Sequence, residues 1–165
     1  ARRSVMVDGR NGEWARTDDA LFVGAGSAVG TTLRSSVDKD NLYFLVEVKD
    51  SQLSDADYAC IYLSSEASSL GLSARRIKVN KTGLVSSEKY QSGAWKTDSS
   101  LGIQASASCL TGQGYIVEVS VPRSSAPSGD TILVDLAHYG QGLSAEERIA
   151  GQAPSTWLYL KNINI

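Results

Sequence analysis

The sequence is poor in the residues that most often build metal sites, disulfide scaffolds and acid–base catalytic sites. Among 165 residues there are two cysteines, Cys60 and Cys109, and one histidine, His138. Two cysteines are too few for a disulfide scaffold, and they lie too far apart for a C-x-x-C motif. Two alternatives stay open for them: one bridge between two strands of an exported protein, or two small buried hydrophobic side chains.

Long apolar runs and an excess of one charge are also missing. No stretch is apolar for long enough to cross a membrane, which argues against membrane insertion. A formal net charge of -2 favours neither nucleic-acid binding nor an acidic tail. Residues 1–4 lack the apolar core of a signal peptide, so we expect the chain to be a mature or excised piece of a longer protein.

No arrangement of residues is typical of a catalytic centre. The sequence shows no nucleophile–histidine–acid set, no phosphate-binding loop and no pair of carboxylates like that of a glycosidase. We therefore predict that the protein is not an enzyme. The parity of His138 with apolar neighbours predicts a structural side chain at the inner edge of a strand, with its hydrogen bonds satisfied.

What the sequence does contain is clearest in residues 37–50. A turn-forming Asp-Lys-Asp-Asn cluster leads into a run of β-branched, aromatic and aliphatic residues that ends at Asp50. One side of this run is apolar throughout and consists of Leu42, Phe44, Val46 and Val48. The other side changes from apolar to charged and consists of Tyr43, Leu45, Glu47 and Lys49. The pattern predicts a central strand with one face in the core and the other partly in solvent, joined by a hairpin to a strand before it.

Similar short stretches, separated by turn signals, follow one another along the chain. Strands are predicted at 21–23, 31–37, 58–63, 75–80, 103–110, 115–121, 131–139 and 157–160. Residues 85–100 are more polar and predict a long loop or an edge hairpin, and residues 144–148 predict one helical turn. Together these elements predict an all-β fold, a two-sheet antiparallel β-sandwich, formed by a single domain over residues 1–165.

An aromatic and basic strand face is the main candidate for a ligand site. If the β-branched and aliphatic residues of 58–63 and 75–80 point inward, the outward set contains Tyr58, Tyr62, Arg76, Lys78 and Asn80. Aromatic rings stack on the apolar face of a sugar, while neighbouring donors bind its hydroxyls or carboxylates. The cations favour an acidic glycan. The alternative is that the tyrosines cover a second small core or an interface, and that the cations are simply solvated.

Trp95 lies in the polar stretch next to this candidate face. Two interpretations stay open for it: an exposed platform that adds to the ligand site, or a lid that packs over the sandwich.

Five carboxylates near predicted turns are candidates for calcium, which prefers oxygen ligands. They are Asp8, Glu13, Asp38, Asp40 and Asp50. No EF-hand spacing links them. The alternative is that most of them hydrogen-bond their own backbone and make turns.

Several groups of residues occur in an order that resembles a known family. They are Val7-Asp8-Gly9 with Glu13-Trp14, then residues 38–50, then 114–119 running into Val121-Pro122, and finally the strand at 130–136. This ordered set resembles the family 9 carbohydrate-binding modules and the wider DOMON-like sandwich group. The resemblance implies a jelly-roll-like β-sandwich that is usually one module of a larger secreted bacterial protein. Members typically bind sugars without catalysis, and bound calcium is common among them.

The positions that hold the sugar in that family are mostly changed here. The resemblance places the family's sugar-binding acid at Cys60, its basic residue at Lys78 and its amide at Ala137. Both clamp tryptophans are missing, because residues 51–57 and 149–152 contain none, and Trp157 matches an aromatic at the start of the last strand instead. Only the basic residue is kept in kind, so the family's clamp site is not carried over.

Two functional hypotheses follow. The first is a non-catalytic carbohydrate-binding module that attaches a secreted or cell-surface, multimodular protein to a polysaccharide or oligosaccharide, acidic glycans included. The second is a protein-interaction or structural spacer module that has lost the sugar site. In the second case the outward tyrosines are covered by a neighbouring module or by the Trp95 stretch.

Overall fold

The computed structural model describes residues 4–14, 20–23, 30–110, 112–129, 131–140, 146–148 and 158–161. The predictions for Trp157, for residues 149–152 and for the start of the helical turn at 144–145 lie outside the described residues. Within these ranges, no helix is long and apolar enough to span a membrane.

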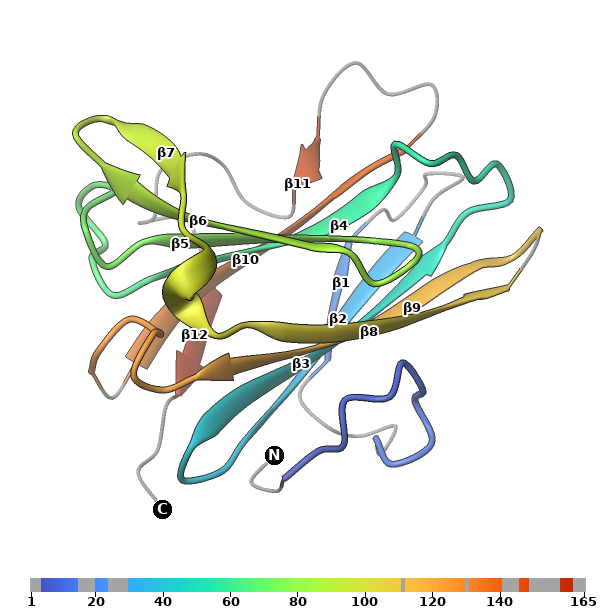
Figure 1. The fold of residues 1–165 in the computed structure, drawn as a ribbon, viewed down its shortest axis with the longest axis horizontal. Helices are drawn as coiled ribbons and strands as arrows, with labels where there is room; N and C mark the ends of the chain where they lie inside the picture. The colour runs from blue at the N-terminus through green and yellow to red at the C-terminus, as the bar shows by residue number, and fades with distance from the viewer. Residues whose placement is uncertain are drawn as a thin grey trace.

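The described strands form two antiparallel sheets that pack as two layers (Figure 1). The first sheet has the order β1-β2-β3-β9-β8, with bounds Ala20–Val23, Gly30–Val37, Asn41–Lys49, Gly114–Pro122 and Gln104–Leu110. The second has the order β11-β10-β4-β5-β6-β7, with bounds Glu147–Arg148, Thr131–Tyr139, Tyr58–Ser64, Arg75–Asn80, Val85–Gln91 and Ala94–Thr97. β12 (Leu158–Lys161) also pairs with β10, and a short 3-10 helix, η1 (Ser99–Leu101), precedes β8. The predicted all-β sandwich is confirmed.

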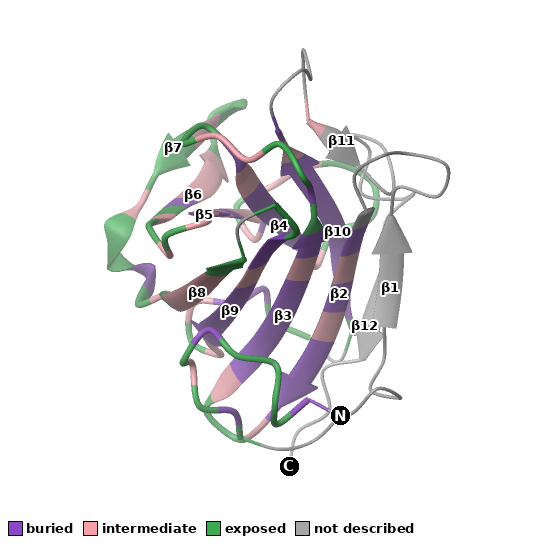
Figure 2. Ribbon diagram, turned by 90° about the vertical axis from the view of Figure 1, so that its right-hand side faces the viewer, coloured by how far each residue is buried: buried purple, intermediate pink, exposed green. Residues whose placement is uncertain are grey.

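The core lies between the two sheets and is built from the alternation seen in the sequence. The predicted inward residues of β3 pack against inward residues of β4, β5 and β10, among them Ile61, Leu63, Ile77, Val134 and Leu136. Figure 2 shows burial concentrated on the central strands and decreasing toward β7. The predicted inward sides of these strands are confirmed, because their alternate side chains belong to one core cluster between the sheets.

The hairpin between β2 and β3 and the start of β9 fix the register of the first sheet. β3 pairs with β2 on one side and β9 on the other, so that Lys49 lies opposite Gly114. Gly114 has a φ of +142°, and a Cβ atom there would lie 1.8 Å from the carbonyl oxygen of Val48. Only glycine fits this close approach of two backbones.

Three predictions about elements and cysteines are settled by the described residues. The stretch 85–100 forms the edge hairpin of β6 and β7 rather than a loop. The helical turn is wrong where it is described, because Glu147 and Arg148 pair with β10 as a strand. The cysteine bridge is also wrong: Cys60 is buried in β4, Cys109 is exposed in β8 of the other sheet, and both are free.

Residues 4–14 run along the outward side of the first sheet (Figure 1). Val5 and Trp14 pack on Tyr43 and Leu45, which explains why the outward side of β3 is buried near its start.

The anchor of this segment is the fully buried carboxylate of Glu118 in β9. Trp14 Nε1 donates to its Oε2 atom at 3.0 Å, and the backbone amides of Asp8 and Arg10 donate to Oε1 at 3.2 and 2.9 Å. A hydrogen bond with Glu118 lowers the pKa of Asp8, while burial raises the pKa of Glu118. A buried carboxylate needs such donors because it has lost water.

Replacing Trp14 with phenylalanine should keep most of the apolar contact but leave Glu118 Oε2 without its indole donor. Removing a hydrogen bond to a buried charged group costs about 1.5–3 kcal/mol, and we expect the free energy of unfolding in urea to fall by that amount. Met6→Ala is the control, because Met6 lies in the same segment and is 71% exposed. Equal stabilities of the wild type and Trp14→Phe would contradict the anchor.

Candidate functional site

Strand register arranges the predicted ligand residues in cross-strand rows on the outward face of the second sheet. The first row is Tyr139, Tyr58 and Asn80, the second is Ala137, Cys60 and Lys78, and the third is Asp135, Tyr62, Arg76 and Glu88. At the end of the sheet, Trp95 in β7 lies opposite Tyr90 in β6. We call this surface the aromatic face.

The first row is a stack of rings with a cation above it. The rings of Tyr58 and Tyr139 stack with their centroids 5.4 Å apart. The ammonium group of Lys78 lies 4.9 Å from the centroid of the Tyr58 ring. This is the geometry of a cation–π interaction, which holds a long and otherwise mobile side chain in place.

A second group of rings forms around Trp95. Its ring meets the edges of Tyr62 and Tyr90 at centroid distances of 5.9 and 5.3 Å, and the Arg76 guanidinium lies 4.9 Å from its centroid. Trp95 is partly exposed, whereas Tyr62 beneath it is only 3% exposed. Each interpretation of Trp95 thus describes one part of its ring. The part that contacts Tyr62 is packed, and the rest reaches solvent.

Among the described residues, Arg76, unlike Lys78, is hydrogen-bonded to a carboxylate of the same face. Arg76 Nε donates to Glu88 Oε2 at 2.7 Å, and its Nη2 forms a second hydrogen bond to the same oxygen. Partial burial opposes the charge of Arg76, but the hydrogen bond and the charge of Glu88 outweigh it and raise the pKa of Arg76. Arg76 therefore stays charged, and its charge is balanced by Glu88 within the face. An incoming anion would compete with Glu88 for the guanidinium group.

Glu146 is a residue of this face that the sequence did not predict. Its two carboxylate oxygens accept hydrogen bonds from Tyr58 OH at 2.7 Å and from Tyr62 OH at 2.5 Å. Because Tyr58 and Tyr62 flank Cys60 along β4, the carboxylate lies over Cys60. Burial and then the charge of Glu146 raise the pKa of the Cys60 thiol, and burial, the hydrogen bond and the charge of Glu146 raise the pKa of Tyr58.

Asn80 has a structural task at the end of β5. Its Oδ1 atom accepts hydrogen bonds from Thr82 N, Thr82 Oγ1 and Leu84 N at 3.0, 2.7 and 2.9 Å. The amide oxygen thus closes the β5–β6 turn, as asparagine often does. The other five predicted ligand residues form two contact groups, Tyr58 with Lys78 and Trp95 with Tyr62 and Arg76, which Glu146 links through the two tyrosine hydroxyls. Asn80 lies at their margin.

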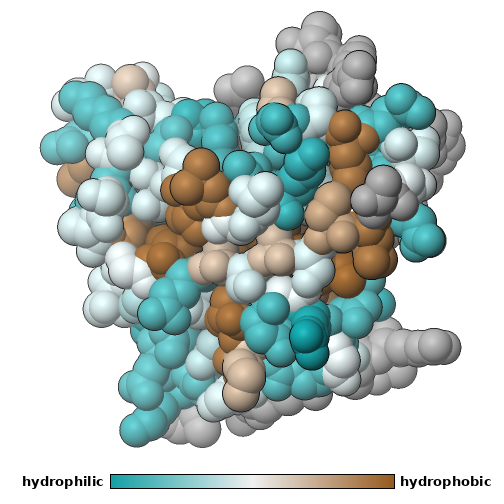
Figure 3. All heavy atoms as spheres, turned by 45° about the vertical axis from the view of Figure 1, so that its right-hand side comes forward, coloured by the Kyte–Doolittle hydropathy of each residue, from teal (hydrophilic) through white to brown (hydrophobic). Residues whose placement is uncertain are grey.

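A hollow lies elsewhere, at one end of the first sheet. It has a volume of about 610 Å³ and is lined by residues that include Asn11, Arg34, Glu47, Lys49 and Leu110. Arg34 Nη1 donates to Glu47 Oε1 at 2.8 Å, so these two charges of its lining are paired with each other. The side of the molecule in Figure 3 carries separate apolar patches among polar side chains rather than one continuous apolar surface.

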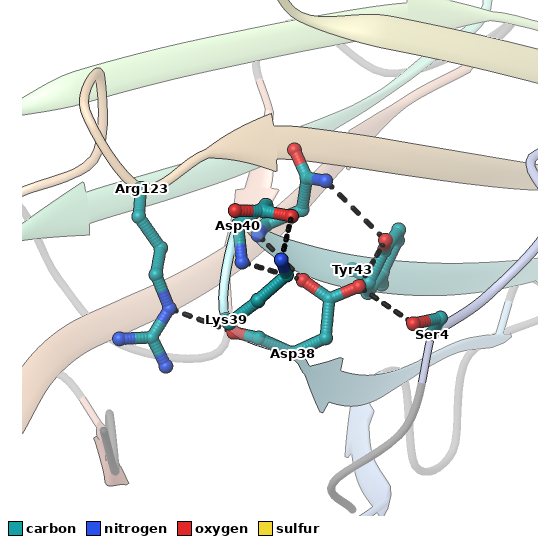
Figure 4. Close-up of polar contacts among 7 residues, drawn as sticks. Ser4, Asp38, Lys39, Asp40, Tyr43 and Arg123 are labelled. Carbon is teal, nitrogen blue, oxygen red and sulfur yellow. Dashed lines mark hydrogen bonds and ion pairs between the residues drawn. The ribbon is translucent and has the colours of Figure 1, made fainter. Parts of the chain in front are cut away.

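Asp38, a calcium candidate, has its carboxylate occupied by hydrogen-bond donors (Figure 4). Oδ1 accepts from the backbone amides of Asp40 and Asn41, both at 2.8 Å, and Oδ2 accepts from Ser4 Oγ at 2.8 Å and Tyr43 OH at 2.7 Å. Partial burial opposes ionisation, but the bonds from Tyr43, Ser4 and the two amides outweigh it and lower the pKa of Asp38 from 3.8 to about 2.

The five calcium candidates do not lie together, although Asp38 and Asp40 share one turn. Glu13 accepts a hydrogen bond from the backbone amide of Met6, and the exposed Asp40 lies beside Lys39. Asp38 and Asp50 are separated by the whole length of β3, about 30 Å for nine residues. The part of the chain that the structure describes holds no group of three or more His, Cys, Asp or Glu side chains placed for a metal. The five residues therefore do not build one shared ion site.

The end of the sandwich near Asp50 is a buried polar region of its own. Asp50 and Asp57 are 6% and 1% exposed, and both lie next to Gly140. Nearby, burial and then the charges of Asp57 and Asp50 raise the pKa of Tyr115, whose hydroxyl has no hydrogen-bond partner among the described residues.

His138 is buried in β10 as predicted. The hydrogen bonds predicted for its ring are not found within the part of the chain that the structure describes.

Comparison with known proteins gives a clear answer for the fold. No family model matches the chain, and no curated protein sequence matches it. Two solved structures of a family 9 carbohydrate-binding module from Caldicellulosiruptor kristjanssonii, in complex with cellotriose and with glucose, are similar at TM-score 0.73 and 18% identity. The similarity covers 98% of this chain and 93% and 95% of theirs. The chain has the fold of a family 9 carbohydrate-binding module.

Within this family 9 fold, three positions singled out by the resemblance prove to be direct neighbours. Ala137, Cys60 and Lys78 lie opposite one another on adjacent strands, where the amide, acid and base of the family are expected. Two of the three side chains are small and apolar here. The only described carboxylate over this row is that of Glu146, which reaches it from outside the sheet.

Asp38 should make the stability of the domain depend on pH. A folded-state pKa of about 2, below the ordinary 3.8, stabilises the fold above about pH 4, and this contribution is lost as the pH falls through 2. We expect Asp38→Asn to lower the free energy of unfolding at pH 7 by about 1–2 kcal/mol, with the difference vanishing near pH 2. Asp55→Asn is the control, because the Asp55 side chain is fully exposed and its ion pair with Lys81 at 3.4 Å is of the surface kind that contributes little to stability. A difference that stays constant from pH 7 to pH 2 would contradict this role.

Calcium is tested by thermal melting of the wild type in EDTA and in excess CaCl2. A ligand that binds only the folded state raises the melting temperature in proportion to the logarithm of its concentration. The five carboxylates are not gathered at one point, and both oxygens of Asp38 already accept hydrogen bonds. We therefore expect the two melting curves to coincide. A saturable rise with calcium, absent with magnesium, would show instead that other ligand atoms form a site.

Proposed function

We propose that this chain is a non-catalytic carbohydrate-binding module whose ligand is bound on the aromatic face. The single observation that carries the proposal is the arrangement of partly exposed rings, Tyr58, Tyr139 and Trp95, around hydrogen-bonding groups of both signs, Lys78 and Glu146. Sugars present apolar C–H faces and a rim of hydroxyls, and this combination of rings and polar groups matches both.

The fold supports the same function. The similar family 9 structures were solved in complex with cellotriose and with glucose. We propose that the natural ligand is a polysaccharide, and that the chain attaches a secreted or cell-surface, multimodular bacterial protein to it. This attachment needs only binding and no bond cleavage.

A second candidate function is supported by the burial of Tyr62. This ring, expected to reach a ligand, is only 3% exposed: it contacts Trp95, and its hydroxyl donates to Glu146. Such covering is what a protein-interaction or spacer module predicts, since its outward rings have become a small core with Cys60, Leu133 and Ala137.

Binding to a panel of neutral and acidic polysaccharides in affinity gels, followed by calorimetry with oligosaccharides, distinguishes the two candidates. We expect the wild type to be retarded by at least one polysaccharide, and we expect Trp95→Ala and Lys78→Ala to raise the dissociation constant about tenfold. Lys39→Ala, at an exposed lysine of the other sheet, is the matched control for Lys78→Ala.

Melting curves of the same variants separate a loss of binding from a loss of folding. A wild type that binds no member of the panel would favour the interaction module. Binding that is unchanged in both Trp95→Ala and Lys78→Ala would place the ligand away from the aromatic face.

A further inference from the structure

Glu146 holds a defined position although it lies outside the sheet core. The two residues that follow it, Glu147 and Arg148, pair with His138 and Ala137 of β10. Its carboxylate bridges the hydroxyls of Tyr58 and Tyr62, which belong to the next strand of the same sheet. Three strands thus hold one carboxylate over the row of Ala137, Cys60 and Lys78.

This carboxylate has hydrogen-bonding capacity beyond what the tyrosines use. A carboxylate accepts about four hydrogen bonds, and the two tyrosines supply two donors. Beneath it, Cys60 and Ala137 are fully buried, small side chains, and neither is a strong hydrogen-bond donor or acceptor. A ligand hydroxyl that reaches this point would therefore meet an acceptor that is already oriented.

Among the residues that the structure describes, the carboxylates of the aromatic face outnumber its cations. Arg76 is engaged by Glu88 through two hydrogen bonds, and the ammonium of Lys78 lies over the Tyr58 ring. Beside these two cations the described face carries three carboxylates, Glu88, Glu146 and the buried Asp135. A neutral hydroxyl can donate to Glu146 and accept from Lys78, whereas an anionic ligand must approach Glu146 as a like charge.

We propose that Glu146 is the acceptor that binds ligand hydroxyls on the aromatic face and makes the face select neutral over anionic saccharides. This inference rests on the proposed carbohydrate-binding function. It reverses the preference for acidic glycans that the cations alone predict, because the sequence did not reveal the carboxylates that offset them.

The test compares two trisaccharides of equal linkage and length: cellotriose, and the β-1,4-linked trisaccharide of glucuronate. Calorimetry on the wild type should show binding of cellotriose at least tenfold tighter than binding of the glucuronate trimer. Glu146→Gln, which keeps the size of the side chain and removes its charge, should weaken cellotriose binding and reduce the ratio of the two affinities about tenfold. Glu66→Gln is the control, because it makes the same charge change at an exposed residue of the β4–β5 connection.

The outcomes separate this inference from the function on which it rests. If cellotriose binds and Glu146→Gln keeps the wild-type ratio, the role of Glu146 is overturned while carbohydrate binding stands. If the glucuronate trimer binds more tightly than cellotriose to the wild type, the selectivity is overturned. If neither trisaccharide nor any panel polysaccharide binds, the function itself fails, and the role of Glu146 fails with it.

A second measurement tests the position of Glu146 without any ligand. Its hydrogen bond and charge contribute to the raised pKa of Tyr58, so Glu146→Gln should move the alkaline absorbance titration of one tyrosine to lower pH. Glu66→Gln should leave the titration unchanged. An unaltered titration in Glu146→Gln would show that the carboxylate does not contact the tyrosine hydroxyls, and this would overturn the inference.

Discussion

The pleat of β4 constrains the core and the aromatic face together. Alternate side chains of a strand point to opposite sides, so Ile61 and Leu63 can pack in the core only if Tyr58, Cys60 and Tyr62 point outward. A shift of register by one residue would exchange the two sets. The hydrophobic packing that holds the sandwich together therefore also fixes the spacing of the two tyrosine hydroxyls that hold Glu146.

The sequence predicts the strands well because the two-residue period is a local signal. The bounds 75–80 and 131–139 agree with β5 and β10, and the outward positions of Tyr58, Arg76 and Lys78 follow from parity alone. Glu146 could not be predicted in this way, because it is 88 residues away from Tyr58 along the chain. It lies in a polar stretch without periodicity, where no local pattern indicates which side chain reaches the sheet.

The least successful predictions were those that assumed a charged side chain to be free for a ligand or an ion. The basic face was inferred from Arg76 and Lys78, but the partner of Arg76 lies in β6, within a stretch whose pairing the sequence left open. The turn carboxylates had the same difficulty. Asp38 offers the oxygens that calcium prefers, yet Ser4 and Tyr43 reach it from outside its own turn. Composition shows which charges exist, whereas only the tertiary structure shows which of them remain available.

The burial of Tyr62 is compatible with ligand binding once the cost of ordering is considered. A flexible ring must lose rotamer freedom when a sugar stacks near it, which lowers the affinity. Here the ring of Tyr62 contacts Trp95 and its hydroxyl donates to Glu146, while the ring of Tyr58 contacts both Tyr139 and Lys78. That loss of freedom is incurred during folding, so a ligand meets groups that are already in place. Tyr62 then acts as the support of the face, and the partly exposed rings beside it provide the contact.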